Sequence, residues 1–447
     1  MSQPFKKSTE FLVKELSIIT KDGLIDITSI YQEINIFDSL LSPVMTGSIL
    51  LTDATGLSNR FLFDGSESIL IHIIKSSNLE DTAFFKKAFR IYKQSDRKNK
   101  GLNSEFYVLH FCSDELMYSD QQRINQSYEN TYGKIVSKIL VDYLRVSENR
   151  LKGIFEDTFG IKQIVIPNLK PIDAISWCAK RSVDYNQSPN YVFFENAVGF
   201  NYVTLSKLLT QDTILNIQFG AKNLKSQAAL DEISMARGFE VIVQNDSLAR
   251  QRSGVNAGQF IGFDPITRTT AIRQIGYGDV YSSMKHSNST ENTSIIQNKA
   301  GIENVKAYNS KKTYSMFGAA QQYSEYIKKN DPESLSKIEN LEDWVFQRKS
   351  IFENLMSKRI KIVMPGNFQL SSGFNVKVDA PNFGKKIKGG GDDNEDTSLN
   401  GNYIIVASRH IIGYDKHETI IEVATTSTNS PVSTSNYIQT EEMETYG

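Results

Sequence analysis

Side chains that could bind a metal ion are few in this sequence and lie far apart. The five histidines stand at positions 72, 110, 286, 410 and 417. His410 and His417 flank one expected hairpin and could meet across it. A zinc site would need further cysteine, histidine or carboxylate ligands at close spacing, and the sequence places none beside this pair. The histidine pattern therefore predicts no metal site.

An acidic cluster near the C-terminus is a second candidate for a metal site. Asp392, Asp393, Glu395 and Asp396 are of the residue type that binds calcium. A calcium loop also needs a glycine at its sharp turn and a bidentate glutamate at its end. The segment lacks that spacing, which favours a solvated loop without a metal ion.

Residues for nucleotide binding or nucleophilic catalysis do not occur in the patterns that such chemistry needs. The sequence holds no Gly-x-x-x-x-Gly-Lys, no Gly-x-Ser-x-Gly, no His-Glu-x-x-His and no Cys-x-x-Cys. Gly254, Gly258 and Gly262 lack the strand-then-helix context of a nucleotide loop. Cys112 and Cys178 stand in apolar runs and are expected in the core. We therefore expect no enzyme activity and no cofactor.

The composition is that of a folded chain with no strong charge preference. Its 447 residues, of which 40% are hydrophobic and 23% charged, suggest about three domains. The net charge of −1 gives no overall attraction to nucleic acid or acidic membranes. The segment MSQPFKKSTE is polar, and no apolar run approaches the roughly 20 residues of a membrane helix. These features predict a soluble protein made in a cytoplasm.

The elements that must position these side chains are expected to be mostly strands. Short alternating runs separated by turn residues fill residues 8–115 and indicate a barrel. Two helical patterns and a hairpin turned around Asn196 and Gly199 follow. Strand patterns then return, interrupted by a stretch rich in serine, asparagine and lysine. The predicted class is a β-rich α+β fold with two similar antiparallel β-barrels in tandem, a small α+β domain between them and a polar insertion.

The expected domains follow these changes of pattern. The segment at 384–400 has no apolar periodicity and is expected to be a flexible excursion from a hairpin. In chain order the domains are a first β-barrel at 1–118, an α+β domain of two helices and a hairpin at 119–212, strands of the second half at 213–281, a polar insertion at 282–337, a helix and second β-barrel at 338–426, and a flexible C-terminal tail at 427–447.

One pattern occurs twice and supports the tandem arrangement. A strand, a polar loop, a strand, a charged turn and another strand follow Gly65, and the same order follows Gly373. Gly373 lies in MPGNFQLSSGFNVKVDAPNF, residues 364–383, where two turns precede an alternating strand. We expect Gly65, Pro365, Gly366 and Gly373 to be structural turns without a catalytic role.

Five segments, in their order along the chain, carry a resemblance to a known family. They are DSLLSPVMTGSILLTDATGL, FDGSESILIHI, IPNLKPIDAISWCAKRSVDYNQSPNYVFFENAVGFNYVTL, GQFIGFDPITRT and GNFQLSSGFNVKV. The first two resemble the first barrel of baseplate hub proteins of contractile-tailed bacteriophages. The third is similar to the family's proline-initiated helix and aromatic hairpin, the fourth to its strand and basic turn, and the last to its C-terminal barrel. The resemblance covers most of residues 10–425, apart from 282–337 and 384–400, which look like insertions.

This resemblance implies a structural virion protein of the phage tail baseplate, assembled in the host cytoplasm. Hub proteins, which are similar to the base of type VI secretion spikes, form a homotrimer whose two barrels per subunit give a near six-fold ring. One face continues the hexameric tail tube, the other holds the three-fold central spike, and DNA passes through the centre during ejection. The implied partners are a central spike protein, tail-tube or tube-initiator proteins, and other baseplate proteins that contact the insertions. No membrane anchoring is implied.

Other classes of function stay open at this point. A tail-associated protein that binds or hydrolyses glycans would also be rich in strands. A hydrolase of this kind would show a cleft with two carboxylates about 5–9.5 Å apart, which a hub would lack. A plain tube or sheath subunit is a further alternative, and it should lack two similar barrels.

Overall fold

The structure is a computed structural model, and most of the residues that it describes lie in strands. A β-rich fold with five helices in the described residues is confirmed. The described residues are 11–57, 63–74, 84–99, 101, 104–147, 150–151, 153–186, 188–219, 233–243, 252, 257–264, 268–276, 284–288, 290–291, 314–319, 341–380 and 399–428.

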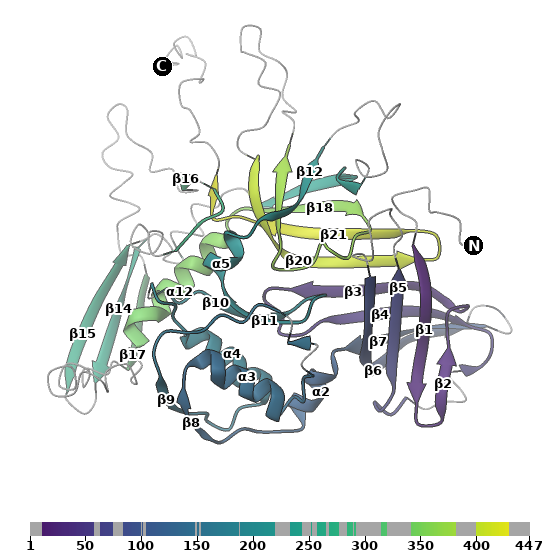
Figure 1. Cartoon of the computed structure of the whole chain (residues 1–447), viewed down its shortest axis with the longest axis horizontal. Coiled ribbons are helices and arrows are strands. Elements are labelled where there is room, and N and C mark those ends of the chain that lie inside the picture. Colours follow the sequence, from purple (N-terminus) through teal and green to yellow (C-terminus); the bar gives the residue numbers. More distant parts are fainter. Residues whose placement is uncertain are drawn as a thin grey trace, which may run out of the picture.

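One sheet of 13 strands runs through both halves of the chain (Figure 1). Its path is β13-β18-β21-β20-β3-β4-β7-β6-β5-β1-β2, with β19 paired to β20 and β12 paired to β19. The first-half strands are β1 (Leu12–Thr20), β2 (Gly23–Asp26), β3 (Tyr31–Ser39), β4 (Thr46–Asp53), β5 (Ser68–Ile74), β6 (Phe84–Asn99) and β7 (Glu105–Cys112). The second-half strands are β12 (Thr213–Gln218), β13 (Gly238–Val243), β18 (Arg359–Pro365), β19 (Asn375–Asp379), β20 (Gly401–Gly413) and β21 (His417–Ala424).

This main sheet is open, and the described strands form no closed barrel where two were expected. The long strand β20 explains the difference, because one of its edges serves both halves. Gly401–Ile404 of that edge pair with β19, and Ala407–Gly413 pair with β3. Each half still encloses a hydrophobic core of its own, one among β1–β7 and one among β18–β21.

The two halves have the same order of five strands. In the first half, neighbours in the sheet are β3-β4-β7-β6-β5, and in the second they are β13-β18-β21-β20-β19. All of these pairs are antiparallel. The order along the chain is also the same, so the repeated pattern after Gly65 and Gly373 corresponds to two three-stranded meanders, β5-β6-β7 and β19-β20-β21.

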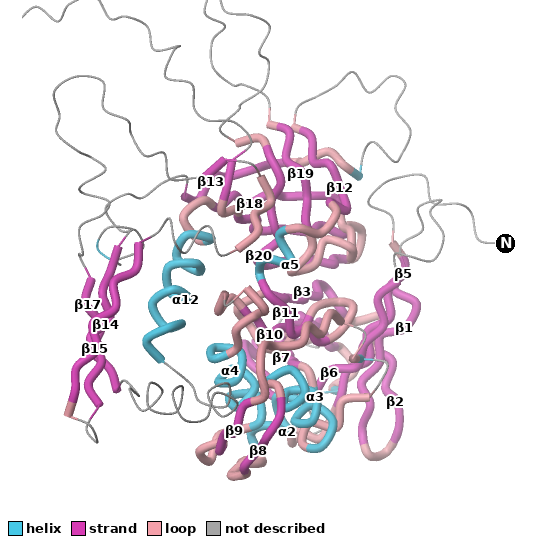
Figure 2. The backbone as a smooth tube through the Cα atoms, turned by 60° about the vertical axis from the view of Figure 1, so that its left-hand side comes forward, coloured by secondary structure: helices cyan, strands magenta, loops and turns pink. Residues whose placement is uncertain are grey.

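A small α+β region separates the two halves along the chain (Figure 2). Its second helix is amphipathic, with Ile135 and Ile139 buried. The third helix begins at Pro171, where proline's fixed φ suits a first helical position. Asn196 and Gly199 exchange backbone hydrogen bonds of 3.0 and 3.1 Å at the tip of the hairpin. The elements are α2 (Asp114–Asp120), β8 (Ser127–Asn130), α3 (Tyr132–Asp142), β9 (Lys162–Val165), α4 (Pro171–Arg181), β10 (Tyr191–Glu195), β11 (Phe200–Thr204) and α5 (Leu205–Leu209).

A separate three-stranded sheet differs from the expectation for residues 213–281. β12 and β13 join the main sheet, but β14 (Ala257–Asp264) and β15 (Thr269–Gly276) pair with each other and β14 pairs with β17 (Tyr314–Ala319). This sheet packs against α12 (Leu341–Leu355), with Phe260 and Phe346 buried (Figures 1 and 2). Phe346 of α12 lies against Gly258 of β14, whereas Ile351 and Leu355 of the same helix are buried in another core.

Buried residues lie on both sides of two predicted domain boundaries. β16 (Thr290–Glu291), inside the expected insertion, pairs with β22 (Ser427–Thr428), inside the expected tail. Asn288 anchors this pairing, since its amide nitrogen donates to the carbonyls of Asn402 and Ser427, both at 3.0 Å. Leu399, expected in a loop, is buried in the second core. Residues 292–313, 320–340, 381–398 and 429–447 lie outside the described part of the chain.

Candidate functional site

The two halves meet where β3 pairs with β20, and we call this pairing the joint. Its register sets Phe37 opposite Arg409 and Asp38 opposite Ser408. Alternation along a strand sends neighbouring side chains to opposite faces. Asp38 and Ser408 are therefore buried on the inner face, whereas Phe37 and Arg409 face outward, with the guanidinium 5.5 Å from the ring centroid.

Asp38 is the buried acceptor that fastens the joint. Its carboxylate accepts hydrogen bonds from the backbone nitrogen of Ser372 and the hydroxyl of Ser408, both at 2.9 Å, and from the hydroxyl of Ser371. Burial raises the pKa of Asp38, and the hydrogen bonds from Ser371, Ser372 and Ser408 offset part of this effect. One carboxylate of the first half thus holds two segments of the second half.

The tip of the β10–β11 hairpin packs beside the joint. The side-chain amide of Asn196 donates to the carbonyl of Ser372 at 3.0 Å, and the backbone nitrogen of Ala197 donates to the hydroxyl of Ser371 at 3.2 Å. Ser371 therefore bonds both to Asp38 and to the hairpin. These contacts lock the hairpin onto the second half.

The residue before Asn196 locks the same hairpin onto the first half. Glu195 is 1% exposed, and its carboxylate accepts from Lys87 at 2.6 Å, from the hydroxyl of Ser113 at 2.5 Å and from the backbone nitrogen of Met45 at 3.0 Å. Arg150 also binds it. Burial alone would raise the pKa of Glu195, but Lys87 and Arg150 outweigh that effect and lower it. Three regions of the chain therefore converge on one hairpin tip, and we call the groups bound to Asp38 and Glu195 the junction.

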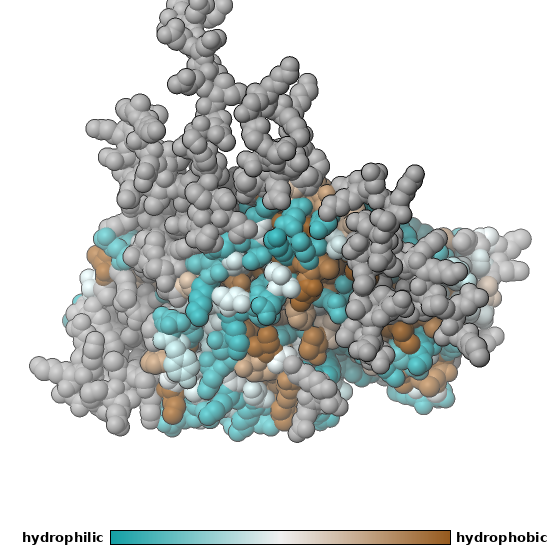
Figure 3. All heavy atoms as spheres, turned by 45° about the horizontal axis from the view of Figure 1, so that its top comes forward, coloured by the Kyte–Doolittle hydropathy of each residue, from teal (hydrophilic) through white to brown (hydrophobic). Residues whose placement is uncertain are grey.

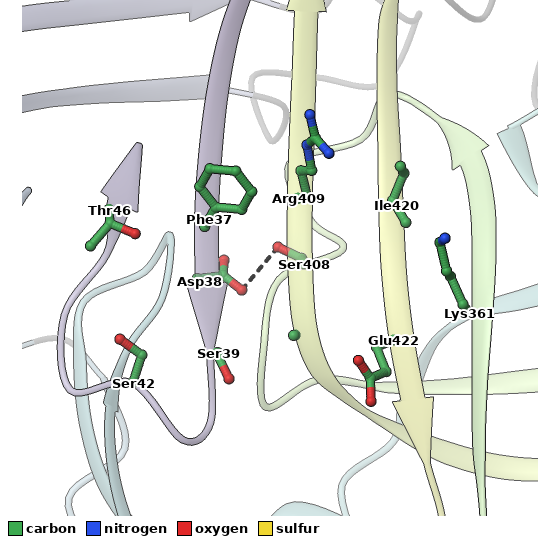
Figure 4. Close-up of a pocket in the computed structure, with 11 residues that line it drawn as sticks. Phe37, Asp38, Ser39, Ser42, Thr46, Lys361, Ser408, Arg409, Ile420 and Glu422 are labelled. Atoms are coloured by element: carbon green, nitrogen blue, oxygen red, sulfur yellow. Dashed lines mark hydrogen bonds between the residues drawn. The ribbon is translucent and has the colours of Figure 1, made fainter. Parts of the chain in front are cut away.

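A surface pocket of about 340 Å³ lies over the joint. Its residues come from β18, β21, β20, β3 and β4, with Ser42 between the last two strands. Figure 4 shows them and the hydrogen bond between Ser408 and Asp38. Its walls mix apolar and charged groups, and the charges are already paired in part, since Arg359 and Glu422 lie 2.8 Å apart. The lining residues are Phe37, Asp38, Ser39, Ser42, Thr46, Lys361, Ala407, Ser408, Arg409, Ile420 and Glu422.

The expected turn residues do not form one site. Gly65 and Gly373 both have a φ of +88°, a region that favours glycine. Gly373 directly follows the serines that bind Asp38, whereas Gly65 precedes β5 in the first half. Pro365 ends β18, and the nitrogen of Gly366 donates to the carbonyl of His417 at 2.9 Å.

His410 and His417 meet across their hairpin, with ring centroids 5.7 Å apart. Phe368 lies against both rings, at 4.8 and 4.7 Å, so the pair sits in an aromatic cluster. Within the described residues no group of three histidine, cysteine or acidic side chains could hold a metal ion. The buried, unbridged state of Cys112 and Cys178 is confirmed.

Some candidates fall outside what the structure describes. The acidic cluster at 392–396 and Gly254 lie in residues that are not described. No helix in the described ranges is long and apolar enough to cross a membrane.

The carboxylates of the junction were missed by sequence reasoning. Asp38 and Glu195 each stand in an apolar strand pattern, in INIFDSL and YVFFEN, at positions that alternation or burial assigns to the interior. A charged residue at such a position is costly unless it is paired or hydrogen-bonded. A carboxylate at an interior strand position could therefore have indicated a buried polar contact. It could not have identified the partner residues, because these come from segments distant in the sequence.

Comparisons with known proteins show the fold. A 43 kDa tail protein of prophage MuSo2 from Shewanella oneidensis has 9% identity, and the match covers 92% of this chain and 97% of that one with a TM-score of 0.51. A tail protein from Neisseria meningitidis has 10% identity, with coverage of 92% and 96% and a TM-score of 0.49. An E. coli component of the type VI secretion system has 9% identity, with coverage of 94% and 79% and a TM-score of 0.41. No sequence family and no curated protein matches the chain. The fold resembles that of phage tail proteins, in agreement with the resemblance seen in the sequence.

Proposed function

We propose that this chain is the baseplate hub of a contractile phage tail, acting as a homotrimeric ring. The observation that carries the proposal is the internal duplication, in which β3-β4-β7-β6-β5 and β13-β18-β21-β20-β19 repeat one strand order. A chain with two similar halves offers six similar units when three copies close a ring. The same ring keeps three-fold symmetry for a partner that contacts only one half of each chain.

This arrangement solves a symmetry problem at the end of a tail. The six similar halves continue a hexameric tube through tail-tube or tube-initiator proteins, and the three copies hold a three-fold central spike. DNA leaves through the centre of the ring. The fold shared with a prophage tail protein supports the placement in a tail. The segments within 282–337 and 384–400 contact other baseplate proteins in this proposal.

The junction supports a structural role over a catalytic one. Glu115 and Glu195 both bind Arg150, so they are carboxylates that lie near each other. They are 3% and 1% exposed, which leaves no access for a sugar between them. A glycoside hydrolase needs its two carboxylates on either side of an open substrate cleft. The buried group serves instead to hold three regions together.

The test is the mass and shape of this chain mixed with its spike partner. Light scattering and particle images should show three copies around an open channel wide enough for duplex DNA, about 20 Å. A dimer, or a trimer whose axis is filled by side chains, would overturn the proposal. Turnover of peptidoglycan or capsule by the purified chain, abolished by one carboxylate substitution, would favour the glycan hydrolase instead.

A further inference from the structure

We infer that β6 of one copy pairs with β13 of the next copy, antiparallel, and so repeats between chains the joint that β3 and β20 make within one chain. The inference rests on the proposed ring and names its interface. It follows from comparing the two halves residue by residue.

The strands β6 and β20 share one irregularity, although β6 has a second one, between Ser95 and Lys98, that β20 lacks. Arg90 of β6 pairs with β5 on one edge and β7 on the other, as Ile404 of β20 pairs with β19 and β21. A β-bulge follows at once in both, between Ile91 and Lys93 and between Ile405 and Ala407. A bulge placed identically in two strands marks a repeated design, because bulges fix the local bend and twist.

The strands differ in what covers the edge beyond the bulge. In β20 that edge, Ala407–Gly413, pairs with β3. In β6 the same edge runs from Lys93 to Asn99, and among the described strands only β7 pairs there, on the opposite edge. Tyr92, at the bulge, is 50% exposed.

The second open edge belongs to β13, the equivalent of β3. β3 lies between β4 and β20, whereas β13 pairs within the described residues with β18 alone. Ile242 in β13 is 39% exposed. An unpaired strand edge is a ready template for another strand.

The two open edges lie at opposite ends of one stretch of the main sheet. That stretch runs β13-β18-β21-β20-β3-β4-β7-β6, so β13 begins it and the free part of β6 ends it. Contact between two unlike patches of identical chains is heterologous, and it gives a ring when the rotation closes. The occupant of each edge is therefore a further copy of this chain. Figure 3 shows small hydrophobic areas among hydrophilic ones on the described surface of one face.

The joint within the chain also supplies the register of the new pairing. Within the chain Ile411 of β20 lies opposite Asn35 of β3. Asn35 pairs with Ser48 of β4, and Glu240 pairs with Lys361 of β18. Because Ser48 and Lys361 hold equivalent positions in the two halves, Asn35 corresponds to Glu240. Ile411 pairs with Glu418 of β21, and Lys98 pairs with Phe106 of β7. Because Glu418 and Phe106 hold equivalent positions, Ile411 corresponds to Lys98. Lys98 of one copy should therefore lie opposite Glu240 of the next.

This register is favourable in charge. Lys98 and Glu240 are both exposed, and opposite charges directly across an antiparallel pair stabilise it. By the same derivation Asn99 lies opposite Phe239, since Ile412 lies opposite Ile34 within the chain.

Cysteine cross-linking tests the pairing. A chain carrying Lys98→Cys and Glu240→Cys, mixed with its spike partner and oxidised, should run as covalent dimer and trimer on a gel and return to monomer with reductant. Residues facing each other across antiparallel strands lie within disulfide range. Background is low because Cys112 and Cys178 are buried. The matched control combines Glu240→Cys with Leu24→Cys, since Leu24 is 66% exposed on β2 at the other end of the sheet path.

The outcomes separate this inference from the proposed function. A trimer by light scattering in which the control pair cross-links and the test pair does not would overturn the β6–β13 pairing and leave the hub standing. Absence of a trimer with the spike partner would overturn both. As a second readout, Lys98→Glu and Glu240→Lys should each raise several-fold the protein concentration at which half of the chains are assembled. Combining the two substitutions should restore the wild-type concentration. A double variant no better than the single ones would contradict the register.

Discussion

The two halves of the main sheet share a backbone plan but differ in what packs against it. Gly65 and Gly373 enter their meanders with the same φ of +88°. A Cβ on Gly65 would meet no atom within 4 Å, whereas one on Gly373 would lie 2.6 Å from the Phe194 ring. The second half is thus built into the centre of the molecule, where the hairpin, β3 and β20 converge. In the first half, no described strand pairs with the equivalent edge of β6, which the proposed ring would fill.

The two buried carboxylates of the junction show a second contrast. Glu195 faces Lys87 and Arg150, whereas Asp38 receives only serine hydroxyls and a backbone nitrogen. The pKa of Glu195 is therefore lowered and that of Asp38 is raised. Both carboxylates connect separate regions of the chain, but only Glu195 has positively charged partners that compensate its negative charge.

The largest loss of stability is expected from Glu195→Gln. The neutral amide removes the buried counter-charge of Lys87 and leaves Arg150 with Glu115 alone. Breaking such a buried group typically costs about 3–5 kcal/mol of unfolding free energy. Urea unfolding at neutral pH measures this loss. The control Asp120→Asn removes an exposed partner of Lys170 and should cost no more than about 1 kcal/mol. Equal losses for the two variants would mean that the junction is not a clamp.

The glycine pair gives the next effect and addresses the contrast between the halves directly. Gly65→Ala should cost about 1–2 kcal/mol, because only the left-handed backbone is strained. Gly373→Ala adds the collision with Phe194, and overpacking of this kind costs a further 1–3 kcal/mol or so. Melting curves of both variants provide the comparison. Equal shifts would show that Phe194 moves aside freely and that the halves are packed alike at this point.

Local patterns predicted much of this fold, whereas the long-range pairings could not be predicted. The proline-initiated α4, the turn at Asn196 and Gly199, and the stripe of α12 depend on residues close in sequence. The repeated strand order was visible for the same reason. The joint was not, because the pairing of β3 with β20 links residues several hundred positions apart. Closed barrels were therefore expected where one shared strand edge joins the halves.

The smallest effect, and the sharpest test of the two carboxylates, is the pH dependence of Asp38→Asn. Because the pKa of Asp38 is raised in the folded protein, the folded state binds an extra proton between the usual aspartate value of about 3.9 and the raised value. Stability from this group therefore falls as pH rises through that window, and the stability of the wild type relative to Asp38→Asn should increase as the buffer is acidified.

The pH dependence of stability from Glu195 has the opposite sign. Its stabilising contribution is present above the usual glutamate value of about 4.3 and is lost as pH falls through the lowered folded pKa, so the wild type should lose its advantage over Glu195→Gln in acid. Urea midpoints of the three proteins at a series of pH values measure both slopes. Two slopes of the same sign would show that the serine donors stabilise a charge on Asp38 as fully as Lys87 and Arg150 do on Glu195, and the contrast between the two sites would fail.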